Sequence, residues 1–223
     1  MFDHIHPYLP FNLEEATTLI VGTLPPPRFT KGELLKEDVD FCYGSKNGML
    51  WPILDHIFNL NLVYDNSKFA IDQRLNFLKK QKIGVCDIVA SAKREKIDAS
   101  DLGMQAVELR DLIGYLHEFS QINTLLFTGG NSKNGPEYFF RRQAKEYGIK
   151  LDVISATVPR IHKFKIENRS IKTVSLSAPS GAANRAIGSM KAYQLQKDLN
   201  PSFTTFDFRV NQYRPFFTRE PID

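Results

Sequence analysis

The stretch TTLIVG, residues 17–22, is a short run of β-branched and apolar residues that stops at Gly22. An irregular, proline-rich segment from Thr23 to Asp40 follows it. A buried strand that leads directly into a loop is the simplest explanation of this pattern. In a parallel sheet, the loops at the carboxyl ends of the strands carry the chemistry. The residues that follow Gly22 are therefore the first place to look for a site.

Strand-like and helix-like patterns alternate along the rest of the chain. Strands are expected at 83–89, 122–127, 150–155 and 171–177, and helices from about Gly48 to Phe58 and at 68–81, 107–116, 135–147 and 183–199. This alternation predicts an α/β protein, a three-layer sandwich with a central, mainly parallel four- or five-stranded sheet flanked by helices. We expect one domain over residues 1–223, with a core at about 17–200 and a C-terminal strap at 201–223.

The tail from Ser202 interleaves aromatic residues with Arg209, Arg214 and Arg219. Two interpretations stay open for it. It packs on the domain as an edge strand or strap, or its arginines and aromatic rings contact a nucleic acid.

Composition excludes several classes of protein. Hydrophobic residues make up 42% and charged residues 24% of the 223 residues, which are ordinary globular values. Two cysteines exclude a disulfide scaffold and a four-cysteine metal site. The net charge of +4 permits binding to a polyanion without requiring it. No membrane span or signal pattern is visible, so we expect a cytoplasmic, monomeric protein.

Only two histidines, His4 and His6, are close enough in sequence to suggest a metal site. At an N-terminus that we expect to be frayed, surface or packing roles are favoured over a metal. The basic segment around Arg160 and Lys165 is expected to be a connection between strands.

Three loops after predicted strands or before predicted helices could bind a ligand. In SAPSG (177–181), Ser180 either binds a phosphate at a helix start or only caps that helix. In FTGGNSKNG (127–135), Thr128 and the glycines either let a ligand approach the backbone or form a tight turn. In FCYGSKNGMLW (41–51), Tyr43 either fills the core or offers an aromatic platform, and Asn47 either caps a helix or offers an amide.

Four segments occur in an order that resembles the uracil-DNA glycosylase superfamily. They are GTLPP (22–26), YGSKNGMLW (43–51), GVCDIVASAKREKIDASDLG (84–103) and SAPSGAANRA (177–186). They look most like the hypoxanthine-DNA (deoxyinosine) glycosylase branch, with the mismatch-specific uracil glycosylases next. The resemblance implies excision of hypoxanthine or uracil from DNA by hydrolysis of the N-glycosidic bond, in base excision repair, without a metal or organic cofactor.

The resemblance also implies roles for individual residues. Tyr43 would stack on a base flipped out of the duplex, and the catalytic group would be Asn47, with Asp87 as the second candidate. The edge of the base would meet Gly22, Thr23, Leu24, Pro25 and Thr128. DNA phosphates would be held by Ser180 and Gly181, and Arg185 would reach the opposite strand.

The sequence departs from the family pattern at several of these positions. Leu24 stands where relatives often have Asp or Asn, and Ala178 replaces the His or Asn before Pro-Ser. An ungapped match places Gly48 at the position of the family's Asn, so we expect Gly44 and Gly48 to absorb a one-residue shift of Asn47. These departures keep a second hypothesis open, a nucleic-acid-binding protein on the same fold without catalysis.

Overall fold

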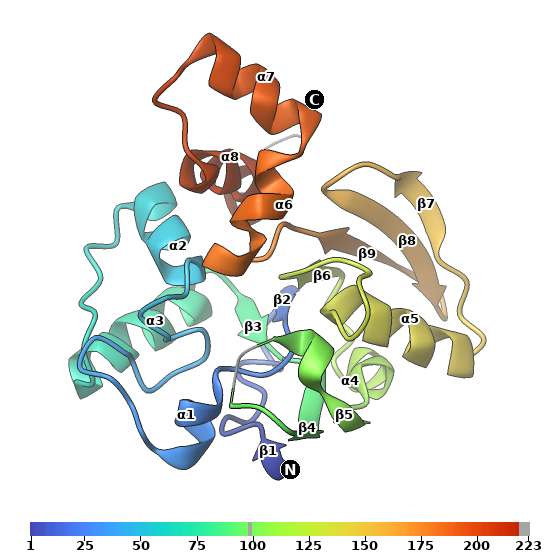
Figure 1. Ribbon diagram of the computed structural model, residues 1–223. Helices are drawn as coiled ribbons and strands as arrows, with labels where there is room; N and C mark the ends of the chain where they lie inside the picture. Colours follow the sequence, from blue (N-terminus) through green and yellow to red (C-terminus); the bar gives the residue numbers. More distant parts are fainter. Residues whose placement is uncertain (98–99, 219–223) are drawn as a thin grey trace.

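The computed structural model describes residues 1–97 and 100–218. Its main sheet has six strands in the order β3-β2-β6-β9-β8-β7 (Figure 1). They are β2 (Thr18–Val21), β3 (Ile83–Val85), β6 (Thr124–Phe127), β7 (Asp152–Ser155), β8 (Arg160–Ile166) and β9 (Arg169–Ser175). Strands β3, β2, β6 and β9 are parallel, whereas β8 and β7 are antiparallel to their neighbours. The predicted α/β sandwich is confirmed, with a mixed sheet that has more strands than we expected.

The two faces of the sheet follow from the alternation of side chains along its central strands. Leu19 and Val21 face the core that includes α4 (Leu112–Glu118) and α5 (Pro136–Glu146). Ile20, between them, faces the core that includes α2 (Leu50–Phe58), α3 (Lys68–Lys80) and α8 (Thr205–Thr218). Figure 1 shows α2 and α3 on one side of the sheet and α4 and α5 on the other. Buried on both faces, the central strands read as continuous apolar runs.

A second sheet has three antiparallel strands in the order β1-β4-β5. They are β1 (Phe2–Ile5), β4 (Val89–Arg94) and β5 (Gln105–Leu109). The N-terminus is therefore paired with β4 and is not frayed as we expected. The expected strand 83–89 divides into β3 and β4, and this division leaves Asp87 in the short link between the two sheets.

Several predicted elements were wrong in detail. The start of the expected helix 107–116, up to Leu109, belongs to strand β5, because Val107 and Leu109, two positions apart, pack on the core as a strand allows. The basic segment 160–165 is strand β8 rather than a connection. The irregular segment after Gly22 contains a short helix, α1 (Pro27–Lys31).

The C-terminal third also differs from expectation. The expected helix 183–199 divides into η2 (Gly181–Ala183), α6 (Asn184–Gly188) and α7 (Lys191–Leu199), with the break at Ser189 and Met190. The tail is not an edge strand but helix α8, which packs on the core beside α2. Arg219, together with Asp98 and Ala99, lies outside the described residues.

Within residues 1–97 and 100–218, no helix has the length and apolar character needed to cross a membrane.

Candidate active site

A cavity of about 930 Å³ opens at the carboxyl ends of β2, β6 and β9. It receives the loops that follow β2 and β9, the loop before α2, and η1 (Asp101–Gly103). Of the residues predicted from sequence, nine line it: Thr23, Leu24, Pro25, Tyr43, Asn47, Asp87, Thr128, Ser180 and Gly181. The topology of the sheet brings these segments together, since parallel strands end at the same edge.

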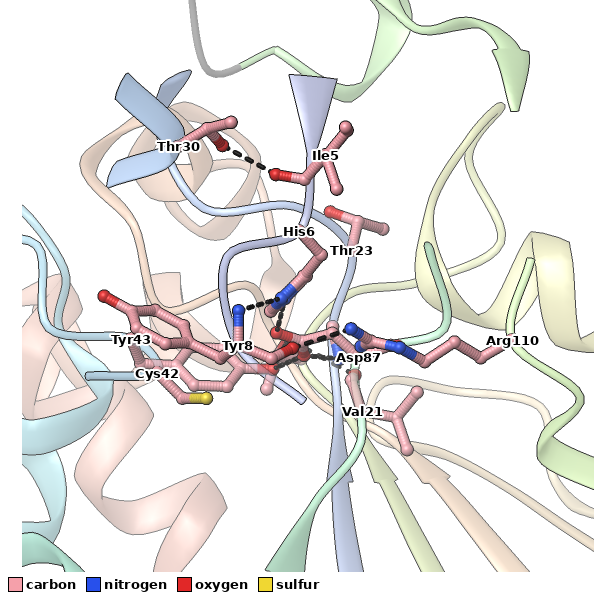
Figure 2. Close-up of polar contacts among 12 residues, drawn as sticks. Ile5, His6, Tyr8, Val21, Thr23, Thr30, Cys42, Tyr43, Asp87 and Arg110 are labelled. Carbon is pink, nitrogen blue, oxygen red and sulfur yellow. Dashed lines mark hydrogen bonds and ion pairs between the residues drawn. The ribbon is translucent and has the colours of Figure 1, made fainter. Parts of the chain in front are cut away.

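The carboxylate of Asp87 is the centre of a hydrogen-bond network beside the cavity (Figure 2). Its Oδ1 accepts from the backbone N–H of Gly22 at 2.6 Å and from Tyr43 Oη at 2.6 Å. Its Oδ2 bonds to His6 Nε2 at 2.9 Å. Because Asp87 is only 6% exposed, these donors replace the water that the charge has lost. The carboxylate thus joins the residues that directly follow β1 and β2 to the loop before α2.

The tautomer of a neutral His6 ring follows from its two contacts. Its Nδ1 accepts the backbone N–H of Tyr8 at 3.1 Å, so a neutral ring carries its proton on Nε2 and donates it to Asp87. Arg110 also links these segments, because its guanidinium donates to the backbone carbonyl oxygens of Asp87 and Tyr8 at 2.8 and 2.7 Å. Figure 2 shows His6 and Arg110 on different sides of Asp87.

Gly22 has no space for a side chain. A Cβ atom there would lie 2.3 Å from Tyr43 Oη and 2.8 Å from Asp87 Oδ1. Gly22 therefore lets the tyrosine and the aspartate approach the end of β2, and it is buried behind the cavity rather than lining it.

Tyr43 adopts an unusual backbone conformation, with φ of 60°. Its hydroxyl lies 2.6 Å from Asp87 Oδ1 and 3.3 Å from Thr128 Oγ1. Burial, and then the neighbouring Asp87 charge, raise the pKa of Tyr43 well above its usual range, so the hydroxyl stays protonated and donates. Tyr43 is half-buried and lines the cavity. The two alternatives, that it fills the core or that it offers an aromatic surface, are therefore compatible.

The loop that carries Tyr43 and Asn47 is fixed by a buried carboxylate. Asp38, which is fully buried, accepts from Arg28 Nε and Nη2, both at 2.7 Å, and from the backbone N–H of Lys46 at 2.8 Å. Burial alone would raise the pKa of Asp38, but the hydrogen bonds from Arg28 and the backbone lower it overall. The ion pair therefore persists at neutral pH and holds the loop in one conformation.

Gly44 and Gly48, which were expected to absorb a one-residue shift through backbone angles closed to other residues, do not have a positive φ, whereas Tyr43 does. Gly44 is needed for close packing, since a Cβ there would lie 1.9 Å from the Val39 carbonyl oxygen. Asn47 does not cap α2, whose N-cap residue is Met49. Its exposed side chain makes no hydrogen bond to any residue in 1–97 or 100–218 and lies at the cavity.

The loop after β9 is organised by the C-terminal helix. Arg209 of α8 is fully buried and donates to the carbonyl oxygens of Ala178 and Ser180 at 2.9 and 2.7 Å. Tyr213 Oη donates to the Ser177 carbonyl oxygen at 2.8 Å. Of the two interpretations of the tail, packing on the domain therefore applies to Arg209, because its side chain is used inside the protein.

The same loop also contacts the loop before α2. Gly48 and Ser180 form an isolated β-bridge, and the Met49 N–H donates to the Pro179 carbonyl oxygen at 2.8 Å. Ser180 is the N-cap residue of η2, as the capping interpretation expected, but its hydroxyl forms no capping bond to that helix. Arg185 is exposed on α6 and does not line the cavity.

Two residues at the cavity were missed as functional candidates. His6 was considered only with His4 as a metal pair, and no local pattern marks its contact with Asp87, 81 residues away. Asp101 lies in the segment 84–103 but received no role, although it lines the cavity and its Oδ1 accepts from Thr23 Oγ1 at 2.7 Å. The only signal in the sequence for Asp101 was an acidic side chain, directly after Ser100, within a segment that the resemblance includes.

No family model matches the chain, and no curated protein matches it. A solved structure that it resembles is the solution NMR structure of a "putative uracil DNA glycosylase" from Methanosarcina acetivorans. The two share 17% sequence identity with a TM-score of 0.52, over 94% of this chain and 99% of that one. At this identity the likeness is one of fold, and this chain has the fold of that glycosylase structure.

Proposed function

We propose that the protein is a monofunctional DNA glycosylase that excises a deaminated base, hypoxanthine or uracil, in base excision repair. The observation that carries the proposal is the 930 Å³ cavity at the carboxyl ends of the parallel strands, with Tyr43 and Asp87 at its wall. The shared fold with a structure described as a glycosylase supports it independently. The closer assignment to the hypoxanthine branch rests on the motifs in the sequence.

A glycosylase must hold a nucleotide that has been rotated out of the duplex. In this proposal, the ring of Tyr43 stacks on the base, and its hydroxyl stays engaged with Asp87. The edge of the base meets the segment from Gly22 to Pro25 and Thr128. Gly22 contributes by letting Tyr43 and Asp87 approach the end of β2. Base–aromatic stacking contributes about 1–3 kcal/mol per base.

The reaction breaks the bond between C1′ of the sugar and a nitrogen of the base. Positive charge develops on the sugar and negative charge on the base, and water then attacks C1′. Asn47 is proposed to orient that water with its side-chain amide. Asp87 is the second candidate, although three protein donors already use its carboxylate.

Phosphates on either side of the flipped nucleotide are proposed to meet the loop after β9. Ser180 and Gly181 offer a hydroxyl and backbone N–H groups at the cavity, and Arg185 offers an exposed charge on α6. The protein would then recognise its DNA substrate both by the phosphates of the duplex backbone and by the flipped base.

A second candidate is a nucleic-acid-binding protein without catalysis. It is favoured by Leu24 and Ala178, which put apolar groups at the cavity where the family pattern has polar ones. Neither side chain can orient water.

The deciding experiment incubates the protein with oligonucleotides that carry uracil, hypoxanthine, xanthine or a mispaired thymine. Alkaline treatment then cleaves the strand at any abasic site. Strand cleavage on at least one deaminated base is the expected result, and it identifies the substrate. Binding to DNA without release of any base would favour the second candidate.

A further inference from the structure

Asp101 lies between two cavities at the edge of the sheet. It lines the large cavity and also a neighbouring one of about 260 Å³, and it shares this position with Thr128 and Ala178. Thr128 follows β6 and Ala178 follows β9, so Asp101 faces the ends of the central parallel strands. That is the position at which the reacting part of a bound nucleotide would lie.

The backbone of Asp101 is held from two sides. Its carbonyl oxygen accepts from Asn134 Nδ2, in the loop after β6, at 2.9 Å. The preceding Ser100 carbonyl oxygen accepts from the buried Arg94 of β4 at 2.6 Å. A carboxylate on such an anchored turn is positioned before any ligand arrives, as a catalytic group must be.

The carboxylate of Asp101 is only partly used by the protein. Oδ1 accepts the Thr23 hydroxyl at 2.7 Å, and Oδ2 has no hydrogen-bond partner within residues 1–97 and 100–218. This differs from Asp87, whose two oxygens accept three protein donors. It also differs from Asn47, because an amide orients water but does not take its proton at neutral pH.

We propose that Asp101 is a catalytic residue of the hydrolysis, an inference that rests on the proposed glycosylase function. As the C1′–N bond breaks, its electron pair leaves with the base, and the Asp101 carboxylate stabilises the positive charge left on the sugar. The oxygen of the attacking water forms a bond to C1′ and gives one proton to Asp101. That proton is then released to the solvent, from which the departing base anion takes one, so atoms and charge balance.

The surroundings of Asp101 adjust its basicity. Burial raises its pKa above the ordinary value and nearby Asp87 acts in the same direction, whereas the Thr23 hydroxyl and Arg94 oppose them. The group must be ionised to act, so the rate falls as the pH drops through its pKa. A raised pKa moves that fall to a higher pH than an ordinary aspartate, at about 3.9, would show.

The test compares wild-type protein with Asp101→Asn, Thr23→Val and the control Asp198→Asn, which removes an exposed charge from α7. Single-turnover excision is measured from about pH 5 to 9. Affinity is measured separately with a duplex that carries a 2′-fluorinated nucleotide, whose glycosidic bond resists cleavage. Thermal melting confirms that each variant folds.

We expect the excision rate of Asp101→Asn to be about 100-fold or more below that of wild type, with unchanged affinity for the duplex. The fall of the rate at low pH, the acid limb of the profile, should be absent in this variant. Thr23→Val should move the acid limb to higher pH, because it removes a hydrogen bond that lowers the Asp101 pKa. The position of this limb is read separately from the rate at neutral pH, since Thr23 also lies at the proposed base-binding segment. Asp198→Asn should match wild type.

A wild-type rate and pH profile in Asp101→Asn would overturn this inference and leave the glycosylase function intact. A loss of rate that only follows a loss of affinity would also overturn it. If Asp101→Asn does not fold, an unmoved acid limb in Thr23→Val overturns the inference and a shifted one supports it. Absence of excision by wild type on every deaminated base would overturn both this inference and the proposed function.

Discussion

Tyr43 Oη donates to Asp87 Oδ1 at 2.6 Å, and this contact joins the loop before α2 to the link between the two sheets. The ring of Tyr43 and the carboxylate of Asp87 therefore have separate tasks that substitutions can distinguish. In the proposed function the ring offers a surface to a base, and the carboxylate fixes the orientation of that surface.

Replacing Tyr43 tests the aromatic platform. Tyr43→Ala should weaken binding to a duplex with a flipped base by about 5- to 150-fold, the equivalent of about 1–3 kcal/mol of stacking. Tyr43→Phe keeps the ring and should bind nearly as wild type, while losing about 1 kcal/mol of folding stability with its hydrogen bond. Equilibrium titration and urea unfolding measure the two effects. Tyr147→Ala, an exposed tyrosine outside the cavity, is the control. Equal losses of affinity in both Tyr43 variants would assign binding to the hydroxyl.

Gly22→Ala should both destabilise the fold and displace Tyr43. The new Cβ would lie 2.3 Å from Tyr43 Oη, closer than packed atoms allow, and such overpacking costs about 1–3 kcal/mol. Chemical denaturation measures this loss. Gly188→Ala is the matched control, because a Cβ there meets no atom within 4 Å. Equal stability of the two variants would contradict the close packing at the end of β2.

Arg209→Gln should disturb the loop after β9 without touching DNA. The substitution removes the Arg209 donor from the partly buried carbonyl oxygens of Ala178 and Ser180, at a cost of about 1–3 kcal/mol for each hydrogen bond lost from the charged donor. We expect lower stability and weaker DNA binding together. Arg142→Gln, an exposed arginine on α5, should change neither. Loss of affinity at unchanged stability would instead place Arg209 in direct contact with DNA.

Asn47 and Asp87 should separate in a kinetic assay at matched DNA occupancy. Asn47→Ala should reduce single-turnover excision by about 100-fold or more and keep its affinity, because its exposed side chain makes no hydrogen bond to residues 1–97 or 100–218. Asp87→Ala should unfold more readily, because it leaves Gly22, Tyr43 and His6 without their acceptor. An Asn47→Ala variant that excises at the wild-type rate rejects Asn47 as the group that orients water.

Affinity for DNA should fall steeply with salt, since phosphate contacts release counterions. In a plot of the logarithm of the binding constant against the logarithm of the salt concentration, we expect a negative slope with a magnitude of about 2.7 or more. This magnitude is the equivalent of about three phosphate contacts. Arg185→Ala should reduce the magnitude of this slope by about 1, whereas Lys145→Ala on α5 should leave it unchanged. Titrations at several salt concentrations provide the measurement. A slope near zero for wild type would reject an interface with phosphates.

The sequence by itself determined the layers of the fold and the loops that form the cavity. Runs such as Leu19 to Val21 and Leu125 to Phe127 predict buried strands, and helical spacing predicts α2 and α3, because both signals depend on neighbours a few residues apart. Loops after parallel strands meet at one edge, so Tyr43, Asp87, Thr128 and Ser180 could be expected together.

Only the tertiary structure decided which of these residues contact one another. His6, the partner of Asp87 just after β1, is 81 residues away, and Arg209 reaches the Ala178 carbonyl oxygen across 31 residues. Segments such as Val107 to Leu116 and the arginine-rich tail fit a strand or a helix locally. Their conformation was settled by pairing with β4 and by packing on α2. Hydrogen bonds and burial between distant segments outweigh local preference, because a short segment gains little stability until the rest of the chain covers it.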